Sequence, residues 1–154
     1  IMPFSIFVVS ARTCGLYGCS AHPGEIQMFE LKVKTDFAAA HQLTMVGEKC
    51  ENLHGHNWIV EVYVTGENLN AAGVLVDFGD IKKHVRAIMT ELDHKFLNEL
   101  DAFKNIQPSS EQIAIYIAGR LQACLEADKL DVRVSRVSAW ESADACATYI
   151  PSVE

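Results

Sequence analysis

The chain has 154 residues, of which 49% are hydrophobic and 21% are charged, and its formal net charge at pH 7 is −7. This length suits one domain with a buried core of its own. The negative charge argues against nucleic acid or an anionic membrane as the main partner, and no apolar run approaches the roughly 20 residues of a membrane-spanning helix.

The first 27 residues differ in pattern from the rest. The apolar stretch from Phe4 to Val9 has no basic region before it, so it fits a signal peptide poorly. Met28 immediately precedes the first clear strand pattern. We therefore expect residues 1–27 to be an extension of unclear role and residues 28–154 to form the functional domain.

Strand patterns follow Met28. From Phe29 to Phe37 the apolar residues fall on odd positions, and the period of two predicts a half-buried strand. A second strand is expected around Trp58 to Thr65, where apolar residues alternate in the same way. Gly73 then marks a turn, and the short apolar run Val74 to Phe78 predicts a third strand.

Helical periodicity begins near Asp80. Four apolar residues then recur at spacings of four, three and four, which predicts a helix. Ser109 followed by Gln112 is typical of a capping box that starts a second helix. Final strands are expected at about Arg133 to Trp140 and Ala145 to Ile150. This order predicts an α+β domain, an antiparallel sheet with two helices on one face.

The strongest chemical signal is His54-Gly55-His56. Residues two apart on an extended backbone point to the same face, so both imidazoles can reach one ion. By parity, His41 lies on the buried face of the first strand, and pairing of the two strands would bring all three rings together. Three neutral imidazoles with an open fourth position describe a catalytic zinc site. A structural zinc with Cys50 as the fourth ligand and three unrelated core histidines are the alternatives.

Other residues support chemistry less directly. Cys50 has polar neighbours and lies close to the predicted metal, so its thiol could act as a base or a nucleophile. Cys124 and Cys146 are expected to be small buried apolar residues. Asp93 and His94 follow the first helix and could form a proton shuttle or a surface pair. The odd number of scattered cysteines, five in all, favours the reducing cytoplasm over a disulfide framework.

Several short motifs occur together in a specific order between Phe29 and Ile150. They are Phe37-Ala38-Ala39-Ala40-His41, Cys50-x3-His54-Gly55-His56, Val76-Asp77-Phe78, Leu92-Asp93-His94, Pro108-Ser109-Ser110-Glu111 and Trp140-Glu141-Ser142. In this combination the chain resembles the 6-pyruvoyl-tetrahydropterin synthase / 6-carboxytetrahydropterin synthase family. The resemblance implies the tunnelling fold (T-fold), in which subunits join their sheets into barrels, usually as hexamers made of two trimers.

The resemblance also implies roles for individual residues. The zinc ligands would be His41, His54 and His56. Cys50 would be the catalytic thiol, with Asp93 and His94 in proton transfer. Glu141 would anchor the pterin, since a carboxylate matches the paired N–H donors of a 2-amino-4-oxopyrimidine. Ser109 and Ser110 would contact the pterin, and Ser109 would also cap the second helix.

The branch of the family is suggested by the spacing of Cys50 and His54. Three residues separate them, which resembles the bacterial 6-carboxytetrahydropterin synthases of queuosine and deazapurine biosynthesis. The expected reaction converts 7,8-dihydroneopterin triphosphate to 6-carboxytetrahydropterin, acetaldehyde and triphosphate. The alternatives are 6-pyruvoyl-tetrahydropterin synthase and a non-catalytic, zinc-stabilised pterin-binding domain. Candidate partners of the triphosphate are the basic residues Lys32, Lys34, Lys49, Lys95 and Arg133.

Overall fold

The computed structural model describes residues 27–44 and 52–152. The proposed extension 1–27 therefore lies almost entirely outside the described residues, as do Cys50 and Lys49. The elements follow in the order β1 (Phe29–His41), β2 (His54–Gly66), α1 (Phe78–Leu92), β3 (Lys95–Phe96), η1 (Leu97–Glu99), η2 (Asp101–Phe103), α2 (Ser110–Ala127), β4 (Arg133–Trp140) and β5 (Cys146–Tyr149).

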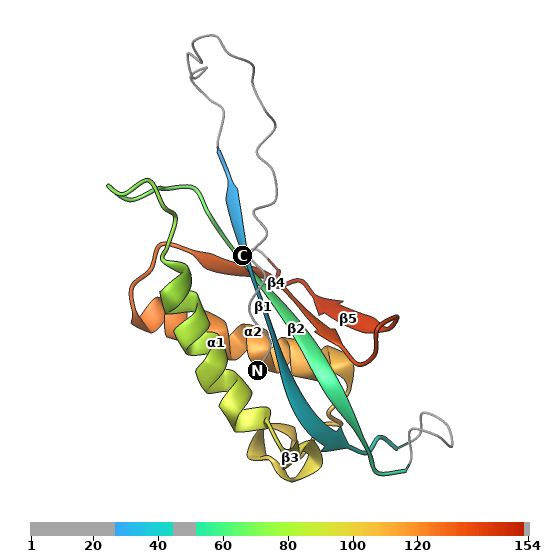
Figure 1. The fold of residues 1–154 in the computed structure, drawn as a ribbon. Coiled ribbons are helices and arrows are strands. Elements are labelled where there is room, and N and C mark those ends of the chain that lie inside the picture. Colours follow the sequence, from blue (N-terminus) through green and yellow to red (C-terminus); the bar gives the residue numbers. More distant parts are fainter. Residues whose placement is uncertain (1–26, 45–51, 153–154) are drawn as a thin grey trace.

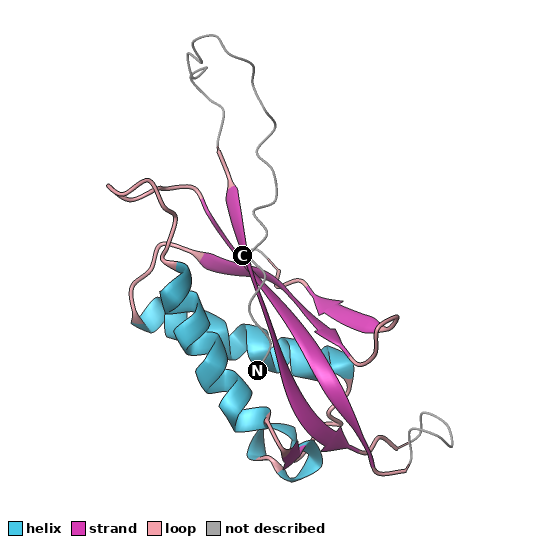
Figure 2. Cartoon of the chain, viewed as in Figure 1, coloured by secondary structure: helices cyan, strands magenta, loops and turns pink. Residues whose placement is uncertain are grey.

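The five strands form one sheet in the order β3-β1-β2-β4-β5, with α1 and α2 packed on one face (Figures 1 and 2). This is the α+β architecture expected from the sequence. Neighbouring strands are antiparallel except β3, which pairs in parallel with β1 through two residues. The sheet is therefore mixed rather than purely antiparallel. Sequence periodicity did not indicate β3, because two residues are too few to show a period.

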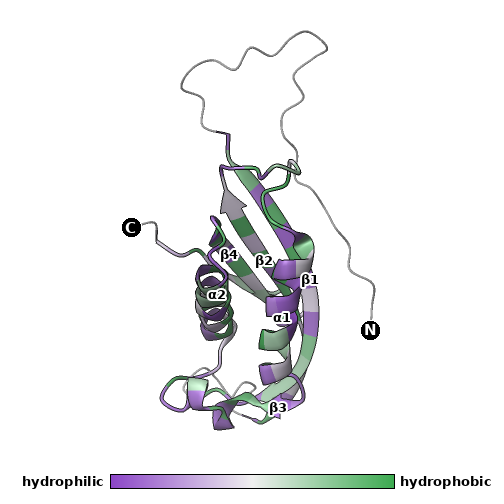
Figure 3. Cartoon of the chain, turned by 90° about the vertical axis from the view of Figure 1, so that its left-hand side faces the viewer, coloured by the Kyte–Doolittle hydropathy of each residue, from purple (hydrophilic) through white to green (hydrophobic). Residues whose placement is uncertain are grey.

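The core lies between the sheet and the helices. Trp58, Val60 and Val62 of β2 are completely buried, so every second residue of this strand faces the helices. Figure 3 shows hydrophobic and hydrophilic segments interleaved along the strands of the sheet. Each helix buries the stripe that its periodicity predicted. The stripe residues are Ile81, Val85, Ile88 and Leu92 in α1 and Ile113, Ile117, Leu121 and Leu125 in α2. No helix in the described ranges is both long and apolar enough to span a bilayer.

The predicted strand from Val74 to Phe78 is wrong. Asn70 and Gly73 form a hydrogen-bonded turn before it, and Asp77 accepts a hydrogen bond from the Gly79 amide at 2.6 Å. Asp77 is thus the N-cap of α1, and Phe78 begins the helix. A short apolar run does not distinguish a strand from a helix entrance, and the capping carboxylate decides between them here.

Candidate metal centre

Two neighbouring strands place the three predicted histidines. β1 and β2 pair in a register that sets His41 opposite His54 and Ala39 opposite His56. All three side chains lie on the face that the helices cover, and the centroids of their rings are 4.6, 4.8 and 5.2 Å apart. The structure therefore brings together the three imidazoles that parity placed on one face.

Backbone carbonyls fix the orientation of two of these rings. The Nδ1 atom of His41 lies 2.7 Å from the Pro108 carbonyl oxygen, and the Nδ1 atom of His54 lies 2.6 Å from that of Asn52. A carbonyl only accepts hydrogen bonds, so each Nδ1 carries the proton and each Nε2 has a free lone pair. The two Nε2 atoms lie 3.0 Å apart. Two lone pairs at this distance favour a cation between them.

His56 and Glu141 complete the donor group. The Nε2 atom of His56 lies 3.2 Å from Glu141 Oε1, but it is buried and has no hydrogen-bond partner of acceptable geometry among the described residues. One donor atom from each of His41, His54, His56 and Glu141 lies within 4.8 Å of all the others. A buried nitrogen without a partner beside converging donors is the arrangement that metal binding satisfies.

Desolvation favours the neutral form of two of the three imidazoles, His41 and His56. Burial lowers the pKa of His41, although its hydrogen bond to Pro108 opposes the shift. Burial also lowers the pKa of His56, against the opposing charge of Glu141. Both rings therefore favour the unprotonated form, which is the form that ligates a metal.

Glu141 also lines a cavity of about 540 Å³, together with Ser109 and Ser110. The Ser110 hydroxyl donates a hydrogen bond to Glu141 Oε2 at 3.1 Å, so one carboxylate oxygen points to the serine and the other to His56. The Ser109 hydroxyl accepts a hydrogen bond from the Gln112 amide and caps α2, as its sequence position predicted. The three residues that the resemblance assigned to pterin binding thus line one cavity next to the histidines.

Asp93 and His94 form a pair of their own. One Asp93 oxygen accepts a hydrogen bond from the Ala38 amide and the other lies 2.9 Å from His94 Nδ1. These two contacts, the Ala38 amide first, lower the pKa of Asp93. The His94 side chain is 82% exposed, and the residue adopts a positive φ of 56°. His94 lines a separate cavity of about 520 Å³ that His56 also lines.

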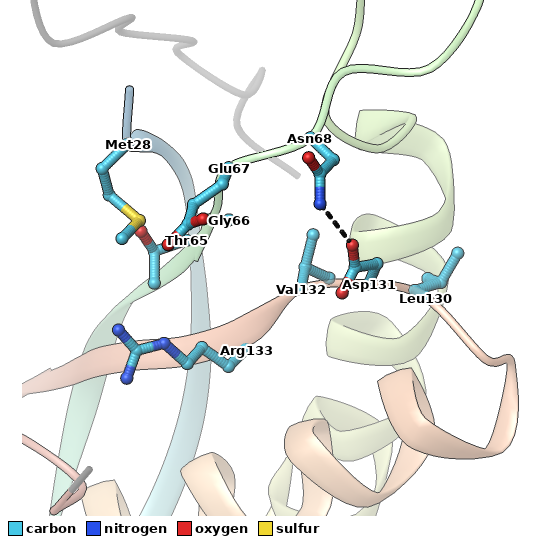
Figure 4. A pocket seen from close by; sticks show the side chains of 9 residues that line it. All are labelled: Met28, Thr65, Gly66, Glu67, Asn68, Leu130, Asp131, Val132 and Arg133. Carbon is cyan, nitrogen blue, oxygen red and sulfur yellow. Dashed lines mark hydrogen bonds between the residues drawn. The ribbon is translucent and has the colours of Figure 1, made fainter. Parts of the chain in front are cut away.

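The candidate triphosphate partners fall in different places. Lys32 forms an ion pair with Glu61 at 2.7 Å, so its charge is already matched. Arg133 lines a cavity at the far ends of β1 and β2, beside Thr65 and across from the Asn68–Asp131 hydrogen bond (Figure 4). That cavity is remote from the histidines, which lie where β2 begins. Lys95 lines the cavity of His94 and His56.

The cysteines differ from expectation. Cys124 is only half-buried and Cys146 is exposed on β5, so neither is the small buried residue that the sequence suggested. Alternation does not reveal the exposure of Cys146, because β5 lies at the edge of the sheet and pairs only with β4 among the described strands. Cys50, the expected catalytic thiol, lies outside the described residues.

Comparison with known proteins identifies relatives of this chain. The family model for 6-pyruvoyl tetrahydropterin synthase matches residues 30–152. A dihydroneopterin monophosphate aldolase of Pyrococcus furiosus is 37% identical over 108 residues, which cover 70% of this chain and 85% of that protein. A 6-carboxy-5,6,7,8-tetrahydropterin synthase of Synechocystis is 37% identical over 91 residues, covering 56% of this chain and 69% of that protein.

The fold comparison leads to the same group. The structure of Caenorhabditis elegans 6-pyruvoyl tetrahydropterin synthase superposes with a TM-score of 0.72 at 25% sequence identity, covering 82% of this chain and 98% of that chain. Human 6-pyruvoyl tetrahydrobiopterin synthase is 41% identical over 81 residues, which are 50% of this chain and 56% of that protein. Proteins with different names are therefore similar to this chain in sequence or in fold.

Proposed function

The chain belongs to the 6-pyruvoyl tetrahydropterin synthase family, and we propose that it is the zinc-dependent 6-carboxy-5,6,7,8-tetrahydropterin synthase of queuosine and 7-deazapurine biosynthesis. The reaction consumes 7,8-dihydroneopterin triphosphate and water and releases 6-carboxytetrahydropterin, acetaldehyde and triphosphate. Two observations favour this branch. Several relatives carry that name, and three residues separate Cys50 from His54.

The observation that carries the proposal is the convergence of three imidazole Nε2 atoms beside Glu141. Ligand nitrogens at about 2.0–2.1 Å in a tetrahedral zinc site lie roughly 3.3 Å from one another, close to the 3.0 Å between His41 and His54. The donor set therefore fits zinc. A zinc ion held by His41, His54 and His56 would supply Lewis-acid polarisation of the oxygens on the pterin side chain.

The chain's own residues would then bind the pterin and move protons. Glu141 would accept hydrogen bonds from the 2-amino-4-oxopyrimidine edge, while Ser110 holds one of its oxygens and Ser109 lines the same cavity. Cys50 would remove a proton from the substrate side chain. Asp93 fixes Nδ1 of His94, so the other ring nitrogen would exchange a proton with the substrate.

A second candidate function follows from one relative's name. The Pyrococcus furiosus protein is an aldolase for dihydroneopterin monophosphate. Cleavage between the first two side-chain carbons would give a 6-hydroxymethyl pterin and a phosphorylated two-carbon aldehyde. The 6-pyruvoyl synthase reaction, which eliminates triphosphate and leaves the carbon chain intact, stays an alternative, as does a non-catalytic pterin-binding domain.

One experiment separates these possibilities. Zinc-loaded protein is incubated with dihydroneopterin triphosphate and, in parallel, with the monophosphate, and the pterin and aldehyde products are identified. We expect acetaldehyde and a 6-carboxy pterin from the triphosphate. A 6-pyruvoyl product, a 6-hydroxymethyl product, or pterin binding without turnover would each replace the proposal by the corresponding alternative.

The oligomeric state, the location in the cell and the domain boundaries belong to the same proposal. The homohexamer, a cytoplasmic location and the division into residues 1–27 and 28–154 stay predictions from the sequence and from the resemblance.

A further inference from the structure

The outer edge of β1 carries a regular series of hydrogen bonds. Every second residue of a strand points its N–H and C=O to the same side. On β1 the even residues point away from β2: the Ala38 amide donates to Asp93 Oδ1, and the Ala38 carbonyl accepts from the His94 amide. Next along this edge, Ala40 pairs with Phe96 of β3.

Side-chain amides continue the series beyond the end of β1. Asn98 accepts a hydrogen bond from the Gln42 amide at 2.9 Å and donates one to the Gln42 carbonyl at 2.8 Å. Two residues later, Gln107 accepts from the Thr44 amide at 2.5 Å and donates to the Thr44 carbonyl at 3.0 Å. The edge formed by residues 38, 40, 42 and 44 is therefore paired step by step, although none of the described strands lies beside the last two.

A carboxamide is suited to this pairing because it offers one acceptor oxygen and a donor nitrogen, as a peptide group does. Asn98 and Gln107 thus extend the sheet by two positions without adding backbone. A carboxylate of the same shape keeps the acceptor but sets its second oxygen against the backbone carbonyl.

These hydrogen bonds lie on both sides of His41, one of the three proposed metal ligands. His41 lies between Ala40 and Gln42 on the same backbone, with its completely buried ring pointing into the covered face. The carbonyl that accepts its Nδ1–H belongs to Pro108, the residue that follows Gln107. The two amides therefore join the backbone around His41 to the segment that supplies its hydrogen-bond acceptor.

We propose that Asn98 and Gln107 are positioning residues for His41: their side-chain amides act as substitute strand partners that hold the ligand and the Pro108 carbonyl in the geometry for metal binding. This inference rests on the proposed metal site. The two side chains bond to backbone atoms of Gln42 and Thr44, so their effect on the metal passes through the backbone and the orientation of the imidazole.

The test uses the full chain with Asn98→Asp and Gln107→Glu, which keep the shape of each side chain. Zn²⁺ affinity is measured by competition with a chelator, and the Co²⁺-loaded proteins are compared by their visible absorption. Loss of partners that orient a ligand typically costs about 10–100-fold in metal affinity. We expect a loss in this range for each variant, with a changed Co²⁺ spectrum.

Gln122→Glu is the matched control. Gln122 also uses its amide to bond backbone, accepting from the Val134 amide at 2.8 Å, but it lies on α2 away from the histidines. This control is expected to lower stability without changing Zn²⁺ affinity. Thermal unfolding of the metal-free proteins confirms folding, and either of the two edge variants decides the question if the other does not fold.

A metal-independent measurement separates this inference from the proposed function. In metal-free protein labelled with ¹⁵N-histidine, the Nδ1–H signal of His41 reports its hydrogen bond to Pro108. We expect both edge variants to weaken or shift this signal and Gln122→Glu to leave it unchanged. Wild-type protein that binds no Zn²⁺ would refute the proposed metal site alone. A His41 signal and a Zn²⁺ affinity unchanged in the edge variants would overturn the positioning role.

Discussion

His54 gives the most direct test of the metal centre at the scale of single residues. Its ring is only half-buried, so His54→Ala should fold, yet it removes one of three converging Nε2 atoms. We expect zinc affinity to fall by more than about 100-fold, since the loss of outer partners alone costs about 10–100-fold. Metal content and chelator competition measure this.

The matched control for His54 is His84→Ala. His84 lies on α1 and contacts Asp128 at 2.7 Å, away from the donor group. It should keep the full zinc content. Equal loss of metal in both variants would show that the histidines hold the ion non-specifically, and the centre described above would not be the binding site.

Glu141 faces both the donor group and the cavity, and Glu141→Gln separates its two possible roles. If the carboxylate anchors the pterin, the amide presents one acceptor fewer and a donor toward the ligand's N–H groups. A lost charge-assisted hydrogen bond costs about 1.5–3 kcal/mol, or roughly 10–100-fold in affinity. We expect pterin binding to weaken by this amount, measured by calorimetry, with zinc content unchanged.

The control for Glu141 is Glu111→Gln, which removes one negative charge from the lining of the same cavity. It should leave pterin affinity nearly unchanged. Loss of zinc from Glu141→Gln would instead identify Glu141 as the fourth protein ligand. In that case the metal has no open position for a substrate, and the catalytic proposal fails.

The elements that carry strong periodicity could be predicted from sequence. Alternation from Phe29 to Phe37 predicted that His41 lies on the buried face of its strand, and the spacing of His54 and His56 placed both on one face of the next strand. If these two strands pair, the three rings come together. The register in which the two strands pair could not be predicted from either strand alone. The approach of Glu141 to His56 could not be predicted for the same reason, because it depends on the position of β4 beside β2.

Elements that depend on particular side-chain contacts could not be predicted. Val74 to Phe78 has the composition of a strand, but the Asp77 cap starts α1 there. The Asn98 and Gln107 amides have no periodic signal, because their partners lie more than 50 residues away in the chain. The order of the family's motifs, rather than any physical pattern, suggested roles for Ser110 and Glu141.

The contact between α1 and α2 provides a prediction at the element scale. Tyr116 of α2 donates a hydrogen bond to Glu91 of α1, which Arg120 also contacts at 2.6 Å. Burial and the Glu91 contact raise the pKa of Tyr116 to about 12. Because the folded state raises this pKa above its ordinary value of 10.0, the stabilisation is complete below pH 10 and is lost as the pH rises toward 12.

Tyr116→Phe should therefore lower the free energy of unfolding by about 1 kcal/mol at neutral pH. The difference from wild type should persist to pH 10 and shrink above it. Urea unfolding between pH 7 and pH 11 measures this, with Tyr149→Phe as a control for loss of a hydroxyl elsewhere. A difference independent of pH throughout this range would contradict the assigned interaction.

The sheet of a single chain leaves strand edges that a larger assembly would cover. β1 has thirteen residues, but β3 pairs with only Ala39 and Ala40 on its outer side. β5 ends the sheet on the other side and pairs only with β4 among the described strands. Long unpaired edges invite pairing with another chain. Joining the β1 edge of one copy to the β5 edge of the next would close such sheets into a ring, as the proposed hexamer requires.

The alternation of backbone groups along β1 permits a test of that assembly by removing a single backbone N–H. The N–H of Ala38 points outward to Asp93, so the N–H of Asp36, two residues earlier in an unbroken register, points to the same edge. Proline at position 36 removes this outward donor and leaves the bonds to β2 in place, which an edge strand tolerates. The control is Asp36→Ala, which removes the carboxylate but keeps the backbone N–H. For wild type and Asp36→Ala we expect light scattering to give a molar mass of about 100 kDa, which corresponds to six chains of 17.0 kDa. For Asp36→Pro we expect a smaller molar mass with the chain still folded. If Asp36→Pro keeps the mass of the wild type, the outer edge of β1 does not take part in the assembly, and the subunits must join through another surface.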